Sequence, residues 1–167
     1  VNLSELDIST ATFGSAVLNG SNLSKVTASS TVFHEAKMRN VNLTEADVTS
    51  AVFEKAVLTN SNFTKATAKD ANFSEADMSR ATLSGMEVSG TNFQKATFVG
   101  ATFDGVVNLK DATLDNLRGA VMAGVDLAGV DLSGVDVNGV TFNGVLNLKD
   151  ATLDDLRGVD LAGVDLS

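Results

Sequence analysis

The stretch AVFEKAVLTNSNFTKATAKDANFSEADMSR, residues 51–80, places an apolar or small residue at every fifth position. The same count begins at Leu3 and runs without a miss to Phe103. A small or apolar residue, often Ala, stands two places before each of these centres, and the other three places in each five are mostly polar. Neither a helix, with a period of roughly 3.6, nor a flat strand, with a period of roughly 2, produces this pattern. A fixed period of this kind indicates a repeat architecture.

A second period, of twenty residues, groups the fives into fours. It is carried by five aromatic residues, Phe13, Phe33, Phe53, Phe73 and Phe93. Four fives are therefore predicted to form one coil, with each five forming one side. The phenylalanines are expected to point inward and to form the structural core by stacking between coils. Adjacent coils should lie about 4.8 Å apart, as neighbouring strands do.

The polar positions obey the same count of twenty. Asn2, Asn22, Asn42 and Asn62 form one predicted outward row, and Ser4, Ser24, Thr44, Thr64 and Ser84 form another. Charges of alternating sign recur at the coil spacing in two further rows, Glu5, Lys25, Glu45, Lys65 and Glu35, Lys55, Glu75, Lys95. Exposed ion pairs stabilise a fold only slightly, so these rows are expected to specify register more than stability.

Fives such as AVLTN, SNFTK, ANFSE, ADMSR, VDLAG and VDLSG resemble the A(D/N)LXX unit of the pentapeptide repeat family. This resemblance covers nearly the whole chain, and it implies an all-β fold, a right-handed quadrilateral β-helix (β-solenoid) with four pentapeptides in each coil. The expected solenoid has about eight coils and forms a single domain over residues 1–167. Residues 1–105 are expected to be regular, and residues 106–167 to contain two irregular coils, near 106–119 and 145–158.

The two irregular coils interrupt the five-residue period with nearly identical sequences. NLKDATLDNLRG at residues 108–119 returns as NLKDATLDDLRG at residues 147–158. In the first copy the apolar centres are Phe103, Leu109, Leu114, Leu117 and Met122, whose gaps of six, five, three and five sum to nineteen. Each copy is therefore predicted to close one coil that is one residue shorter than a regular coil.

The gap of three has helical spacing, which predicts one tight helical turn over Leu114 and Leu117. Asp111 could cap its N-terminal side, and Arg118-Gly119 resembles a helix stop. The second copy repeats this pattern at Asp150, Leu153, Leu156 and Arg157-Gly158. Two interpretations stay open: a duplication that the stack tolerates, or a pair of shaped ledges on one wall that a partner recognises.

No catalytic motif occurs in the sequence. There is no Cys nucleophile, no HExxH, no GxSxG and no phosphate loop ending in GK[ST], and the single histidine, His34, occupies an outward position. Glycines that close successive fives after residue 120 are expected at backbone corners, where a positive φ is easiest for Gly. We therefore expect neither an enzyme nor a cofactor or metal site.

The charge distribution points to a protein partner. The net charge is −9, and residues 106–167 contribute −6 of it from 4 basic and 10 acidic side chains. An acidic surface of this kind disfavours direct nucleic acid binding and favours a basic site on a protein of unknown identity. The candidate partner-binding residues are Asp126, Asp131, Asp136, Asp165, Arg118 and Arg157. One outward row is predicted to read Asp7, Thr27, Asp47, Thr67, Glu87, Asn108, Asp126, Asn147, Asp165.

Three functions fit these observations. The first is a non-catalytic protein-interaction rod or scaffold. The second follows from the family resemblance, because some pentapeptide repeat proteins protect DNA gyrase from quinolones as acidic mimics of DNA. Acids about two coils apart, roughly 10 Å, are sparser than duplex phosphates, which weakens this second hypothesis. The third is an ice-binding solenoid, although charges interrupt its polar rows and the rows stop near residue 105.

The ends and the composition bear on partners and compartment. The chain begins and stops inside a repeat, so we expect a longer native protein or an end-to-end homodimer that covers the open strand edges. No apolar run in the sequence approaches a membrane span. The compartment is unknown from the sequence, and a soluble, cytoplasmic protein is the expectation.

Overall fold

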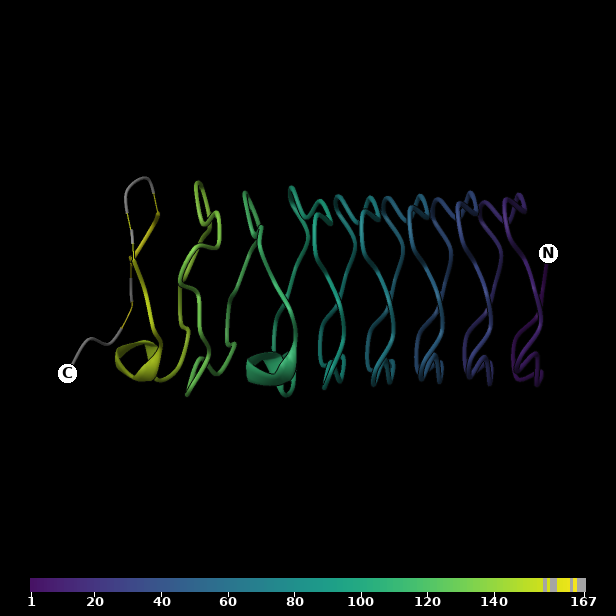
Figure 1. The fold of residues 1–167 in the computed structure, drawn as a ribbon, viewed down its shortest axis with the longest axis horizontal. Coiled ribbons are helices and arrows are strands. Elements are labelled where there is room, and N and C mark those ends of the chain that lie inside the picture. The colour runs from purple at the N-terminus through teal and green to yellow at the C-terminus, as the bar shows by residue number, and fades with distance from the viewer. Residues whose placement is uncertain (155, 157–158, 163, 165–167) are drawn as a thin grey trace.

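Parallel β-bridges between residues 19 to 21 positions apart hold the chain together in the computed structural model, which describes residues 1–154, 156, 159–162 and 164. The bridges build a β-helix whose coils are stacked along one long axis, with the N-terminus at one end (Figure 1). Among the described residues, the only helical elements are two 3-10 turns, η1 (Leu109–Asp111) and η2 (Leu148–Asp150).

The bridge residues fall into four rows, which we call walls A to D. Each wall also includes the inward residues on either side of a bridge residue and the two turn residues that follow. The bridge positions of wall A are 2, 22, 42, 62, 82, 102, 121, 141 and 160, and those of wall B are 7, 27, 47, 67, 87, 107, 126 and 146. Wall C has 12, 32, 52, 72, 92, 113, 131 and 152, and wall D has 17, 37, 57, 77, 97, 116 and 136.

Two kinds of backbone hydrogen bond shape each five-residue side. Between coils, the Phe53 N–H donates to the Asn72 carbonyl (2.7 Å), and the Asn72 N–H donates to the Ala51 carbonyl (2.9 Å). Within a coil, the Ala56 N–H donates to the Phe53 carbonyl (2.9 Å) and closes the turn. The last residue of that turn, Lys55, has a φ of 57°. Such left-handed residues recur at the corners and turn the chain into the next wall.

Glycine takes over the corner position in the C-terminal part of the chain. The corner glycines from Gly124 to Gly144 have φ between 68° and 72°. This confirms the prediction that they lie where the backbone turns, and Gly adopts this conformation without the strain that a Cβ introduces.

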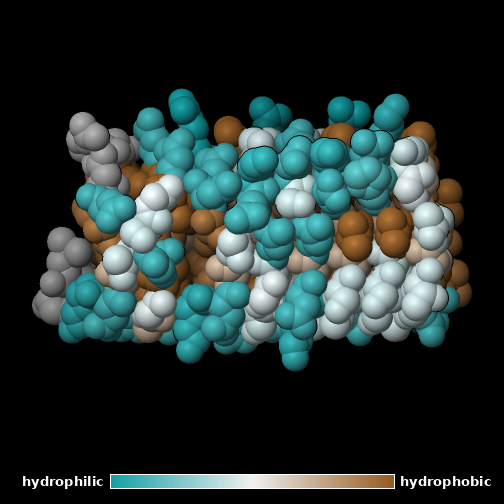
Figure 2. All heavy atoms as spheres, in the orientation of Figure 1, coloured by the Kyte–Doolittle hydropathy of each residue, from teal (hydrophilic) through white to brown (hydrophobic). Residues whose placement is uncertain are grey.

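The core is a column of inward side chains. Phe33, Phe53, Phe73 and Phe93 are fully buried, whereas Phe13, in the first coil, is only partly buried. Neighbouring rings of this row stack with centroids 4.6 to 5.4 Å apart. Figure 2 shows one face of the outer surface, where hydrophilic residues gather along the upper edge and along the left part of the lower edge.

The irregular coils close with nineteen residues, as the bridge between Thr102 and Val121 shows. The predicted helical turn over Leu114 and Leu117 is wrong, because the helical residues are Leu109–Asp111 in the gap of six. The extra residue in that gap is taken up by Asn108 in a left-handed conformation (φ 63°) followed by the 3-10 turn. Asp111 therefore ends the turn instead of capping one.

The three-residue gap between Leu114 and Leu117 forms a tight corner, which side-chain hydrogen bonds join to the preceding coil. Thr97 and Asn116 form no bridge, but the Asn116 Nδ2 donates to the Ala96 carbonyl (3.2 Å). The Asp115 Oδ1 accepts a hydrogen bond from the Lys95 N–H (2.7 Å). Asp154 repeats this contact in the second copy by accepting from the Gly134 N–H (3.0 Å). At this corner an aspartate side-chain oxygen thus accepts the hydrogen bond that a backbone carbonyl accepts in a regular coil.

The predicted outward row on wall B also needs correction. Glu87 bridges to Val107, and Asp126 bridges to Leu146, so Asn108 and Asn147 do not lie in that row. Both asparagines sit one residue further along, where the left-handed conformation begins the 3-10 turn.

Candidate interaction surfaces

The four walls differ in charge. Among the described residues, wall B carries three basic and seven acidic side chains, and wall C carries two basic and six acidic ones, so each has a net charge of −4. Wall A, with two basic and four acidic side chains, has a net charge of −2. Wall D alone is positive, with four basic and two acidic side chains and a net charge of +2. The acidity of the chain is therefore concentrated on two successive walls.

Three of the predicted partner-binding aspartates, Asp126, Asp131 and Asp136, lie at the bridge positions of one coil. The Asp126 carboxylate accepts from the Ala128 N–H (3.0 Å), and the Asp131 carboxylate accepts from the Ser133 N–H (2.9 Å). Asp136 makes the same contact with the Asn138 N–H (3.0 Å). The acidic side chain at a bridge position thus stabilises the turn two residues later, as an Asx-turn does.

These hydrogen bonds also favour the ionised carboxylates. The Ala128 N–H and the Asn147 side chain lower the pKa of Asp126. The hydroxyl and the N–H of Ser133 lower the pKa of Asp131. Both groups therefore carry full negative charge at neutral pH.

The structure does not gather the predicted partner-binding residues on one surface. Asp126 lies on wall B, Asp131 on wall C and Asp136 on wall D. Arg118 lies on wall D one coil before Asp136, as the bridge between Asn116 and Asp136 places it. Asp165 and Arg157 lie outside the described residues. A partner that contacts a single wall would meet only part of this set.

The stack opens on walls B and C after the first irregular coil, and we call this opening the seam. Within the described part of the chain, no backbone hydrogen bond joins residues 106–114 to residues 125–131. On wall A, by contrast, Val121 exchanges two hydrogen bonds of 2.8 Å with Phe103 and Ala101. On wall D the Leu117 N–H donates to the Asp136 carbonyl (2.8 Å). The shortened coil therefore stays paired with the next coil on two walls only.

A groove of about 400 Å³ lies at the seam on wall B. Its lining combines apolar side chains, an exposed strand edge and charges of both signs. The lining residues are Gly105, Val106, Val107, Asn108, Leu109, Lys110, Gly124, Asp126 and Ala128. Val107 is 47% exposed there. Unpaired backbone groups at an accessible edge can accept an additional hydrogen-bonding partner.

The groove and the basic wall were missed from the sequence. Only Asp126 among the predicted binding residues lines the groove. The six-residue gap between Phe103 and Leu109 could have indicated the groove, because an extra residue disturbs the register with the next coil. The wall D basic residues had no local signal, since they are far apart in sequence and share only their place in the coil.

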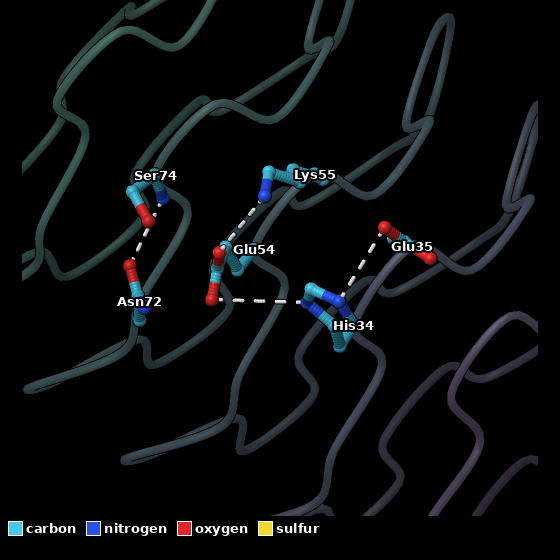
Figure 3. Close-up of polar contacts among 6 residues, drawn as sticks. All are labelled: His34, Glu35, Glu54, Lys55, Asn72 and Ser74. Carbon is cyan, nitrogen blue, oxygen red and sulfur yellow. Dashed lines mark hydrogen bonds and ion pairs between the residues drawn. The ribbon is translucent and has the colours of Figure 1, made fainter.

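The single histidine takes part in an exposed polar cluster (Figure 3). The His34 Nε2 lies 3.6 Å from the Glu35 carboxylate, and its Nδ1 lies 3.7 Å from the Glu54 carboxylate. The Lys55 Nζ lies 3.5 Å from Glu54. Of the predicted alternating charges, Lys25 and Glu45 do pair across coils, at 3.9 Å. Ion pairs this exposed contribute little to stability.

The described residues hold no cluster of three or more His, Cys, Asp or Glu side chains suited to a metal ion. In the same part of the chain, none of the helical elements has the length and hydrophobicity needed to cross a membrane.

Comparison with solved structures finds proteins of the same repeat type at low identity. HetL, a pentapeptide repeat protein involved in heterocyst differentiation regulation from the cyanobacterium Nostoc sp. strain PCC 7120, is 21% identical, with a TM-score of 0.42 over 96% of this chain and 87% of that chain. Rfr23 from the cyanobacterium Cyanothece 51142 is 19% identical, with a TM-score of 0.36 over 72% of this chain and 83% of that one. QnrB1, a plasmid-mediated fluoroquinolone resistance protein, is 16% identical, with a TM-score of 0.40 over 100% of this chain and 94% of that one.

A comparison with curated proteins finds no match. Family models match three overlapping parts of the chain: a pentapeptide repeat region over residues 6–81, and pentapeptide repeats over residues 68–113 and 107–145. Together with the five-residue units and the β-helix that they form, these matches show that the chain belongs to the pentapeptide repeat family.

Proposed function

We propose that the protein is a non-catalytic interaction rod that binds a basic protein partner on walls B and C. The observation that carries this proposal is the net charge of −4 on each of these successive walls. Charge of one sign along a surface steers an oppositely charged partner and raises its association rate. In this proposal the rod is a right-handed quadrilateral solenoid of about eight coils that forms one domain over residues 1–167.

The seam provides a defined contact surface for the partner, which charge alone does not provide. Long-range attraction steers a partner but gives little orientation, whereas a groove with an exposed edge and apolar side chains gives a defined contact. Val107 and Ala128 offer apolar surface there, and Asp126 offers a carboxylate beside it. We therefore place the centre of the partner site at the seam on wall B, which corresponds to the first of the two predicted ledges.

The test is partner capture with matched variants. Glu87→Gln with Asp126→Asn and Asp131→Asn neutralises three carboxylates, which lowers the net charge of wall B from −4 to −2 and that of wall C from −4 to −3. Each replacement keeps a side-chain oxygen that accepts the turn N–H. Glu5→Gln with Glu45→Gln and Asp104→Asn on wall A, which removes the same number of negative charges, is the control. The proposal is supported if the parent and the control retain a basic partner and the neutralised variant does not. Added salt should weaken the retention. Equal retention by all three would contradict the proposal.

DNA mimicry toward DNA gyrase is the second candidate, and the succession of two acidic walls is the observation that favours it. Against it, Asp47, Glu87 and Asp126 lie two coils apart along wall B, roughly 10 Å, whereas a duplex carries one charge for about every 1.7 Å of its axis. A supercoiling assay separates the two functions. Inhibition by the parent that is lost on Asp126→Asn, Asp131→Asn and Asp136→Asn would favour mimicry, and no inhibition at any soluble concentration would remove it.

A further inference from the structure

Wall D is the positive surface of an otherwise acidic rod. Its basic residues are Lys37, Arg39, Arg80 and Arg118, and all four are exposed. Every arginine among the described residues lies on this wall. The arginines recur every second coil, so successive guanidinium groups leave the backbone about 10 Å apart along the axis of the rod.

Three successive coils build a continuous patch on this wall, formed by Arg80, Val99 and Arg118. The Arg80 Cγ lies 3.4 Å from the position that a Cβ would occupy on Gly100. The Val99 side chain lies 3.6 Å from the equivalent position on Gly119. The two glycines thus let the Arg80 stem and the Val99 side chain pack on the next coil. Val99 remains 51% exposed, so the patch presents an apolar surface between two cations.

The acidic residues of wall D do not neutralise this patch. They are Asp77 and Asp136, whose carboxylates accept from the N–H groups of Ser79 (3.1 Å) and Asn138 (3.0 Å). Within the described part of the chain, no ion pair shorter than 4.0 Å involves Arg80 or Arg118. Two guanidinium groups are therefore presented to solvent with their hydrogen-bond donors available.

We propose that wall D binds an extended acidic protein segment that runs along the axis of the rod. In a polyproline II segment, an extended conformation with three residues per turn, residues three positions apart project from the same face about 9 Å apart, which is close to the spacing of the arginines. A segment with a carboxylate at every third residue would place one carboxylate on Arg80 and the next on Arg118. An apolar side chain between the two carboxylates would cover Val99. Arginine suits this role because its planar donors pair with both oxygens of a carboxylate.

The surroundings favour an acidic peptide over a nucleic acid. Wall D lies between wall C, with a net charge of −4, and wall A, with a net charge of −2. Charges on these two adjoining walls repel a densely charged phosphate backbone more than a sparsely charged peptide. Val99 also gives an apolar contact that a phosphate backbone does not use.

The experiment is fluorescence anisotropy at low ionic strength with a labelled peptide of repeated Glu-Val-Thr units. The reference peptide has the same composition with all its glutamates at one end. Arg80→Gln with Arg118→Gln removes the two cations. Lys25→Gln with Lys65→Gln is the matched control, because it removes the same charge from turn positions of wall A. Circular dichroism of each variant establishes that the β-helix is retained.

We expect the spaced peptide to bind at least tenfold more tightly than the reference peptide, and the arginine variant to lose at least tenfold in affinity. The control should stay within about twofold of the parent. Equal binding of the two peptides, or equal losses in both variants, would overturn the proposal. Tighter binding of a single-stranded oligonucleotide to the same two arginines would also overturn it, in favour of a nucleic acid partner. Because the site lies on wall D, its failure leaves the proposal for walls B and C untouched.

Discussion

Replacing Phe53 with Ala tests the stacked core at a ring that has three aromatic neighbours. Phe53 is fully buried and stacks on Phe33 at 4.8 Å and on Phe73 at 4.6 Å, with interplanar angles of 12° and 3°. The ring of Phe63 meets it edge-on at 6.1 Å. Truncation removes all three ring contacts and leaves a cavity that the paired coils on either side cannot close.

The expected loss in free energy of unfolding is about 3 to 5 kcal/mol, the range for a fully buried Phe replaced by Ala. Contacts between aromatic rings contribute about 0.5 to 1.5 kcal/mol each beyond the buried area, which places Phe53 toward the upper end. Phe13→Ala is the matched control, because Phe13 is partly buried and has one neighbour in the row, Phe33, at 5.4 Å. Its expected loss is smaller.

Urea denaturation followed by circular dichroism measures both variants. Because stacked repeats can unfold in parts, native-state hydrogen exchange of amides in the Phe53 coil provides a local value beside the global one. A loss below about 1 kcal/mol for Phe53→Ala, or an equal loss for Phe13→Ala, would refute the assignment of this row to the centre of the core.

His34→Ala should change the free energy of unfolding by less than about 0.5 kcal/mol, because its contacts with the Glu35 and Glu54 carboxylates are exposed to solvent. A thermal denaturation shift as large as that of Phe53→Ala would contradict this. Burial raises the pKa of Asp47, but hydrogen bonds from Thr49 and Ser29 lower it by more, so the net pKa is below its ordinary value. The ionised Asp47 carboxylate should therefore stabilise the fold above its unfolded pKa of about 4, and this stability should be lost as the pH falls through the lower folded pKa. In an acid titration, the free energy of unfolding of Asp47→Asn should depend less on pH than that of the parent. At the seam, the backbone N–H of Asp126 should exchange with solvent much faster than that of Val121 on wall A, and equal protection in hydrogen exchange followed by NMR would show that the seam is closed.

The repeat made most of the fold predictable. An inward residue at every fifth position and a Phe at every twentieth leave one arrangement in which like side chains stack, and the bridges follow that arrangement through residue 107. The nineteen-residue length of the irregular coil was also predictable, because the apolar centres still had to return to the same wall. The position of its helical turn was not, since the sequence spacing of Leu114 and Leu117 is equally compatible with a tight corner.

The candidate surfaces depend on register that the sequence does not display. Asp126, Asp131 and Asp136 are neighbours in sequence but lie on three different walls, while Arg80 and Arg118, far apart in sequence, share one wall. Whether a shortened coil stays paired with the next one depends on whether each wall brings its backbone groups into register. The sequence by itself therefore determined the coil, the core and the net charge of this protein. Only the tertiary structure decided which charges share a wall and where the stack opens, because both depend on distances between residues about twenty or more positions apart.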